Sequence, residues 1–338
     1  MTGQSTPASA VAARSLTAVV GLAVVLATAA CQRPPGTVPL DRALVLGGRS
    51  VGPDQLRRGA VAYTHYCRAC HGDEGDGKGT AAPGLSPPPR DLRLGVYKFG
   101  AVPAGQLPTD ADFRRIVRGG LHGTAMLAWD VPDPQLDDLI QYVKAFSPRW
   151  WTEQAGEPIA LSRDPWAAGD PDAAITRGKR VYHGMAQCAV ACHPAYVTRA
   201  EIFSFTQQLT GMRVEAFRPD LYAPVPKPSD FGVAIVPTDF TFSPLRAGET
   251  IPDIARTIAA GIGGTAMPTW KNVLPDADLW AMATYVRSLV VARGTAAAEA
   301  LRAQLRTQAP WTPPPPPPPP PAAGAPGLTP AGPPASVP

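Results

Sequence analysis

The sequence has few cysteines, little excess charge and no apolar run long enough to cross a membrane. Of its 338 residues only five are cysteine, and four of these fall into two short motifs, which leaves one cysteine and therefore no pair for a structural disulfide. A net charge of +4, with no basic run interleaved with aromatics, argues against nucleic-acid binding. The apolar run at residues 16–30 is shorter than the about 20 residues of an ordinary membrane-spanning helix. The length fits roughly two domains of 100–200 residues each.

The two cysteine motifs carry the chemistry. Residues 67–71 read Cys-Arg-Ala-Cys-His, and residues 188–193 read Cys-Ala-Val-Ala-Cys-His. Two cysteines ahead of a histidine are typical of covalent haem attachment, in which the thiols form thioethers with two vinyl groups and the imidazole ligates the iron. The alternatives are a redox dithiol or half of a zinc site, which need a βαβ setting or four ligands closing a small module. The surrounding sequence fits neither. The attachment residues are therefore Cys67, Cys70, Cys188 and Cys192.

An internal repeat surrounds these motifs. Each unit opens with a helical stretch that carries an arginine, a glycine and, four residues later, a tyrosine. Glycine and tyrosine at this spacing share one face of a helix. After the cysteine motif, residues 89–92 and 237–240 echo each other weakly. The residues of the two opening stretches are Arg58, Gly59 and Tyr63, and then Arg177, Gly178 and Tyr182.

The late half of each unit matches better. Residues 120–126 align with residues 261–267 as a Gly-x-x-Gly-Thr-Ala-Met loop, called here the methionine loop, and a tryptophan stands three residues after each methionine. Apolar residues at i, i+3, i+4 and i+7, starting at Leu136 and at Leu279, then predict an amphipathic helix that closes each unit.

Each unit resembles a class I cytochrome c domain, which is monohaem and mostly helical. The resemblance covers approximately residues 51–150 and 170–293. It implies an all-α fold of two tandem domains, two covalent haems c, and first and last helices that cross near the glycine. It also implies that the methionine of the late loop supplies the sixth iron ligand. The implied axial ligands are His71 and Met126 in the first domain and His193 and Met267 in the second.

Three further histidines offer a bis-histidine alternative. His122 lies four residues before Met126, but its counterpart in the second unit is Gly263. His65 and His183 also lack equivalents in the other unit. A ligand role that is absent from one repeat is the weaker interpretation, so His65, His122 and His183 are expected at the surface or at the rim of a pocket.

The second unit departs from the first in two ways. Its motif has three residues between the cysteines instead of two, which requires a bulged turn of the π type. It also carries an insertion at about residues 195–236, with a helix expected at residues 199–209 and a Pro-rich stretch at residues 219–228. The insertion either covers a haem edge, docks a partner or is a tolerated surface loop.

The ends of the chain predict export. Residues 1–30 have the architecture of a secretory signal, and residues 28–31 resemble a bacterial lipoprotein box in which Cys31 is lipidated. An uncleaved anchor, or plain cleavage that leaves a free cysteine, is the alternative. Residues 31–50 are expected to form a tether, 151–169 a linker, and 294–338 a terminal helix remnant followed by a disordered Pro-rich tail. The protein is thus expected on the periplasmic side, anchored to a membrane by lipid.

These features predict an electron-transfer protein and not an enzyme. Two haems with histidine and methionine ligands are expected to pass single electrons between a redox protein donor and acceptor, and a membrane oxidoreductase complex is one such partner. One alternative is a dihaem peroxidase, which needs a haem with an open coordination site. Another is a monohaem carrier whose second domain is a docking module.

Overall fold

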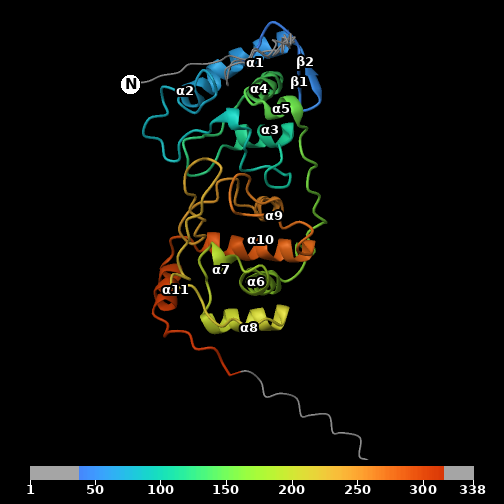
Figure 1. Ribbon diagram of the computed structural model, residues 1–338. Helices are drawn as coiled ribbons and strands as arrows, with labels where there is room; N and C mark the ends of the chain where they lie inside the picture. The colour runs from blue at the N-terminus through green and yellow to red at the C-terminus, as the bar shows by residue number, and fades with distance from the viewer. Residues whose placement is uncertain (1–37, 316–338) are drawn as a thin grey trace, which may run out of the picture. The chain divides into compact units, whose positions relative to one another are not determined.

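Helices make up nearly all of the regular structure in the computed structural model, which describes residues 38–315 (Figure 1). The first repeat contains α1 (Pro53–Tyr66), α2 (Arg68–His71), the 3-10 turn η1 (Leu92–Leu94), α3 (Asp110–Gly119), α4 (Asp133–Ala145) and α5 (Arg149–Thr152). The second contains α6 (Pro171–Arg180), the π turn η2 (Val181–Met185), α7 (Cys188–Ala191), α8 (Arg199–Thr210), α9 (Ile251–Ala260), α10 (Asp276–Val291) and α11 (Ala296–Arg306). The predicted helix at residues 199–209 is confirmed as α8.

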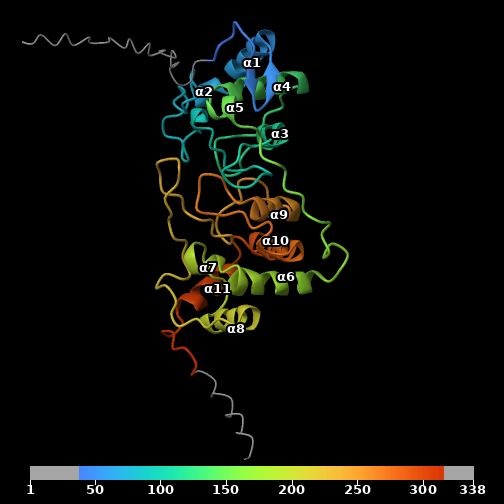
Figure 2. The same ribbon diagram turned by 45° about the vertical axis from the view of Figure 1, so that its right-hand side comes forward.

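The first and last helices of each repeat cross at a glycine. A Cβ on Gly59 would lie 2.3 Å from the carbonyl oxygen of Asp138 in α4, and a Cβ on Gly178 would lie 2.0 Å from that of Ala281 in α10. Backbone approach this close leaves no room for any side chain. The crossing implied by the family resemblance is therefore confirmed in both repeats, and α10 lies between α6 and α9 (Figure 2).

The helices start and stop at signals in the sequence. Thr109 caps α3 by accepting a hydrogen bond from the backbone of Asp112, and Thr250 caps α9 through Asp253 in the same way. Both helices end at a glycine with positive φ, from which the methionine loop departs.

A small sheet corrects the all-α expectation and the assignment of residues 31–50 to a tether. Strands β1 (Leu44–Leu46) and β2 (Arg49–Val51) pair antiparallel, and Leu46 and Val51 are fully buried in the first core. Trp150, just before the predicted linker, is also buried there, and its carbonyl accepts a hydrogen bond from the N–H of Gly47 at 2.7 Å. The first domain thus begins before residue 51, because Leu46 and Val51 of its opening hairpin belong to the same apolar core as α1 and α4.

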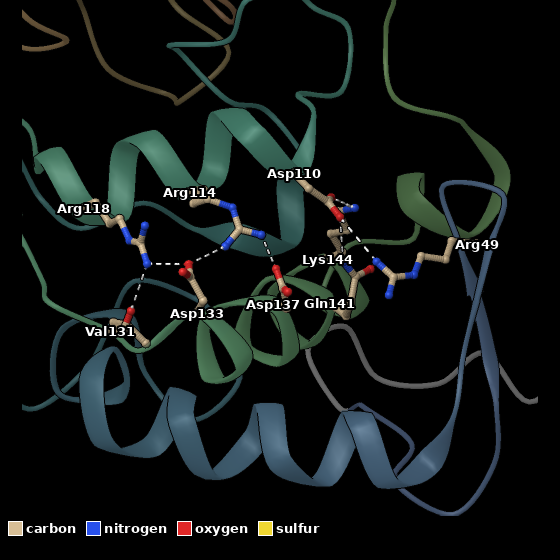
Figure 3. A network of polar contacts seen from close by, with 9 residues as sticks. All are labelled: Arg49, Asp110, Arg114, Arg118, Val131, Asp133, Asp137, Gln141 and Lys144. Carbon is tan, nitrogen blue, oxygen red and sulfur yellow. Dashed lines mark hydrogen bonds and ion pairs between the residues drawn. The ribbon is translucent and has the colours of Figure 1, made fainter.

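Polar contacts attach α3 to α4 in the first repeat (Figure 3). Asp110 contacts Lys144, whose side chain is only 6% exposed, and it accepts a hydrogen bond from Gln141 at 2.9 Å. Farther along α3, Arg114 contacts Asp133 at 3.2 Å. In the second repeat the position equivalent to Arg114 is a buried alanine, so α9 packs on α10 through apolar contacts instead.

The insertion of the second repeat is ordered and packs at both ends. Its helix α8 lies against η2, and the indole N–H of Trp311 donates to the carbonyl of Val214 at 3.3 Å. At the other end, Phe231 lies against the first repeat, under the guanidinium of Arg90 at 3.4 Å. The insertion therefore serves as a structural part of the fold and is not a loose surface loop.

The two repeats contact each other through the methionine loops, and all described residues belong to one compact unit. The N–H of Gly263 donates to the carbonyl of Lys98 at 3.1 Å, and that of His122 donates to the carbonyl of Arg246 at 3.0 Å. Lys98 and Arg246 occupy equivalent positions in the repeat, so these bonds are equivalent to each other. A Cβ on Gly263 would lie 2.1 Å from the carbonyl oxygen of Tyr97, which explains why no side chain stands there.

The ends of the chain lie outside the described residues. This applies to the predicted signal at residues 1–30, to Cys31 and to the Pro-rich tail beyond residue 315. Within residues 38–315, no helix is long and apolar enough to cross a membrane.

Candidate haem sites

The first cysteine motif follows directly from α1. Cys67 ends that helix, and the N–H of His71 donates to the carbonyl of Cys67 at 2.9 Å, which closes one α-helical turn. Burial raises the pKa of the Cys67 thiol to about 12. A redox dithiol needs the thiolate, which this environment disfavours. Within the described residues, no cluster of three or more histidine, cysteine or carboxylate side chains could hold a metal ion, so a zinc site lacks its ligand set.

The second motif absorbs its extra residue as a wider turn. The N–H of His193 donates to the carbonyl of Cys188 at 3.0 Å, a bond that spans five residues where the first motif spans four. This is the π-type turn that the spacing predicts. The turn starts at Gln187, whose φ of 51° lies in the left-handed region. Burial raises the pKa of the Cys188 thiol to about 12 as well.

Each motif histidine is held by a backbone carbonyl of its own repeat. His71 donates from Nδ1 to the carbonyl of Arg90 at 3.0 Å, and His193 donates from Nδ1 to that of Thr238, also at 3.0 Å. Because a carbonyl only accepts, Nδ1 carries the proton and Nε2 keeps its lone pair for a metal. Burial lowers the pKa of both imidazoles, which favours the neutral ligand form. These carbonyls belong to the weak sequence echo at residues 89–92 and 237–240, a role that the sequence did not reveal.

The tyrosine of each first helix fixes the residue after the histidine. Tyr63 donates its hydroxyl hydrogen to the carbonyl of Gly72 at 2.7 Å, and Tyr182 donates to that of Pro194 at 3.1 Å. Burial raises the pKa of both phenols, so they remain protonated donors at neutral pH.

The two methionine loops have the same internal hydrogen bonds. The N–H of Met126 donates to the Thr124 hydroxyl at 3.1 Å, and that of Met267 to the Thr265 hydroxyl at 3.2 Å. Each threonine hydroxyl donates in turn, at 2.8 Å, to the carbonyl three residues before it. The threonines of the Gly-Thr-Ala-Met pattern therefore set the backbone of the loops, and both methionines are presented in the same local conformation.

The remaining histidines separate into two kinds. His65 and His122 are exposed. His183 is not at the surface or at a pocket rim, which corrects the expectation. It is fully buried, its Nδ1 donates to the carbonyl of Lys179 at 2.8 Å, and its Nε2 accepts from the N–H of Tyr196 at 3.1 Å. Both ring nitrogens are therefore committed to the backbone, which leaves His183 no lone pair for iron.

We expect His183 to make the second repeat acid-sensitive. Burial lowers its pKa from 6.5 to about 3. As pH falls below 6.5 the unfolded chain takes up a proton that the folded chain refuses until about pH 3, so stability falls across this window by up to about 1.4 kcal/mol per pH unit. Urea unfolding at several pH values should show a smaller acid loss for His183→Gln. The exposed His65→Gln should keep the wild-type loss, and an equal loss in both variants would contradict the assignment.

Three cations without a carboxylate partner gather where the repeats meet. Within residues 38–315, the side chains of Arg90, Lys98 and Arg246 make no ion pair. Burial, together with the neighbouring Arg90 and Arg246, lowers the pKa of Lys98 to about 8. Burial and Arg246 lower the pKa of Arg90 to about 10. Such a cluster fits a bound anion, because anions relieve both the desolvation and the mutual repulsion of the cations.

The comparisons with known proteins agree with this geometry for the first repeat. The model of the family "Cytochrome C oxidase, cbb3-type, subunit III" matches residues 54–143. These residues form a cytochrome c domain similar to that subunit, and such a domain implies covalently bound haem c and electron transfer.

A solved structure is similar over a longer stretch. A chain from the reducing HAO-like protein complex of Kuenenia stuttgartiensis has 26% sequence identity and a TM-score of 0.56, with 75% of this chain and 99% of that chain covered. Because it covers 75% of this chain, the structural similarity extends well beyond residues 54–143. None of the curated proteins matches.

Proposed function

We propose that this chain is a dihaem c-type cytochrome that passes single electrons between redox proteins outside the cytoplasm. Its first haem is held by Cys67, Cys70, His71 and Met126. The second is held by Cys188, Cys192, His193 and Met267. It acts as an electron carrier and not as an enzyme.

The observation that carries the second haem is the equivalence of the two sites. The Nδ1 bond of the histidine, the tyrosine bond behind it and the threonine bonds of the methionine loop all recur in the second repeat. They recur although the spacing of the cysteines differs. A repeat that served only as a docking module would have no need for a buried, neutral histidine at position 193 or for the loop that presents Met267.

The residues of the chain also fit the propionate groups of a haem. Haem carries two propionate carboxylates, and the unpaired cations Arg90, Lys98 and Arg246 are suitable partners for them. When bound, haem supplies an iron that gains and loses one electron. The Nδ1 hydrogen bonds fix the imidazole planes, and the threonine hydroxyls hold the methionine loops. Because neither ligand has to move, electron transfer proceeds with little rearrangement of the chain.

The partners and the location follow from the same proposal. Cys31 carries a lipid anchor after removal of residues 1–30, so the protein is exported and held at the periplasmic side of a membrane. Similarity to a chain of a redox protein complex supports a role beside other redox proteins. The carrier then links a donor and an acceptor, in the manner of a cytochrome subunit of an oxidoreductase complex.

The test is the intact mass of the mature protein before and after acid extraction of loose haem. We expect two covalent haems plus a lipid. One covalent haem would refute the two-centre carrier and support the docking module. Hydrogen peroxide turnover by the reduced protein would instead support the dihaem peroxidase, and the carrier predicts that no turnover is seen.

A further inference from the structure

The carbonyls of the first cysteine motif are satisfied by a glycine-rich loop. The N–H groups of Gly77 and Gly79 donate to the carbonyls of His71 and Cys70 at 2.9 and 3.1 Å, and that of Ala81 donates to the carbonyl of Ala69 at 2.8 Å. A Cβ on Gly79 would lie 2.2 Å from the carbonyl oxygen of Ala69, so only glycine allows this approach. The short loop after His71 thus holds the motif in place.

The second repeat has no such loop after its histidine. Residues 194–198 read Pro-Ala-Tyr-Val-Thr, with no glycine, and α8 begins at the next residue. The carbonyls at the end of the motif would therefore have no donors from their own loop. A buried carbonyl without a partner destabilises the fold, so another segment has to supply the hydrogen-bond donors.

The insertion supplies them, mainly through Arg218. Its Nε donates to the carbonyl of Ala189, between the cysteines, at 3.1 Å, and its Nη2 donates to the carbonyl of His193 at 2.8 Å. The N–H of Val225 donates to the carbonyl of Cys192 at 2.9 Å. The insertion therefore supplies donors at the histidine, at the second cysteine and at one residue between the cysteines.

Arg218 is built into the insertion. Its side chain is 15% exposed. It also donates to three carbonyls of the insertion, those of Asp220 at 2.6 Å, Leu221 at 3.2 Å and Ala223 at 2.8 Å. One planar guanidinium thus bridges the wide turn and the segment that follows α8. A lysine has a single point charge and cannot reproduce this fork.

We propose that Arg218 is a positioning residue for the second haem. It holds the Cys188–His193 turn so that both thiols and the imidazole face one haem, which compensates for the extra residue in the motif. This inference rests on the proposed dihaem function. In the attachment step, each thiol adds across a vinyl group. The sulfur–carbon bond forms at one carbon and the thiol proton goes to the other, so the addition needs no oxidant.

The test uses the full-length protein carrying Arg218→Met, which keeps the aliphatic stem and removes every donor. Intact mass should show that the ratio of two-haem to one-haem protein falls about tenfold, since the lost bonds come from a charged donor. The haem on Cys67 and Cys70 serves as an internal reference and should stay fully attached. In the two-haem fraction, only the second haem should change its reduction potential, and Arg218→Lys should restore both properties in part.

Two controls separate positioning from general stability. Arg213→Met removes another arginine of the insertion, which pairs with Glu215 at 3.3 Å and does not contact the motif. Ile202→Ala weakens the buried face of α8 but leaves every donor of the motif in place. Both should retain two haems.

A wild-type ratio and an unchanged second potential in Arg218→Met would overturn the inference, as would an equal loss in Ile202→Ala. A single haem on the unchanged protein would refute the dihaem function itself, and this inference with it.

Discussion

Replacing Met267 with alanine should lower the reduction potential of the second haem by roughly 0.2 V, about a quarter of the ~0.8 V range that axial ligands span. The loop around Met267 is held by the Thr265 hydroxyl and by the left-handed Gly261. The substitution therefore removes the thioether and leaves the backbone in place. A thioether ligand favours the ferrous state, so its loss favours the ferric state. Spectroelectrochemical titration of both haems measures the shift.

The internal repeat provides the matched experiment. Met126→Ala should lower the first potential by a similar amount and leave the second nearly unchanged. Met212 is 55% exposed and lies outside both loops, so Met212→Ala should alter neither potential. If Met267→Ala left the second haem at its wild-type potential, Met267 would not be an axial ligand.

Replacing Gly178 with alanine should lower the free energy of unfolding of the second repeat by about 3 kcal/mol, the upper end of the usual cost of overpacking. The new Cβ would lie 2.0 Å from the carbonyl oxygen of Ala281 and 2.8 Å from Cβ of Tyr285, and neither neighbour is a flexible side-chain end. Helices α6 and α10 would have to separate, which would expose the core between them. Chemical denaturation followed by circular dichroism, on protein with its haem content measured, gives the change.

Gly119 offers the matched control. It lies in α3, where a Cβ would meet nothing within 4 Å, and its φ is not in the left-handed region. Gly119→Ala should be neutral or stabilise by up to about 1 kcal/mol, because alanine restricts the unfolded chain. Equal effects of the two substitutions would show that the crossing in the second repeat is not as tight as the structure indicates.

Much of the fold could be predicted because its determinants recur. Gly59 and Gly178 stand at the same place in two units, and both close helix crossings are confirmed. The π-type turn follows from counting residues between Cys188 and His193, and the structure shows its five-residue bond. The identity of the iron ligands remains a prediction, which the methionine substitutions test.

Other features could not be predicted because they join segments far apart along the chain. The hairpin at residues 44–51 falls almost wholly in the segment that the sequence predicts as a tether, because three-residue strands carry too little pattern to be recognised. The sequence predicts His183 at the surface or at the rim of a pocket, and only the packing of α8 and Tyr196 buries it. The carbonyls that orient His71 and His193 carry no side-chain signal at all, because every residue has one.

The sequence by itself determined the chemistry of this protein: the cysteines, histidines and methionines that fit haem, their repetition, and the glycines that let helices cross. These are properties of residue type and of spacing along the chain, and both are given by the sequence. Only the tertiary structure decided how the second motif keeps its wide turn, because Arg218, which lies in the insertion twenty-five residues after His193, bonds to it through space. Only the tertiary structure brought Arg90, Lys98 and Arg246 together, because hydrogen bonding and charge act through space and not along the chain.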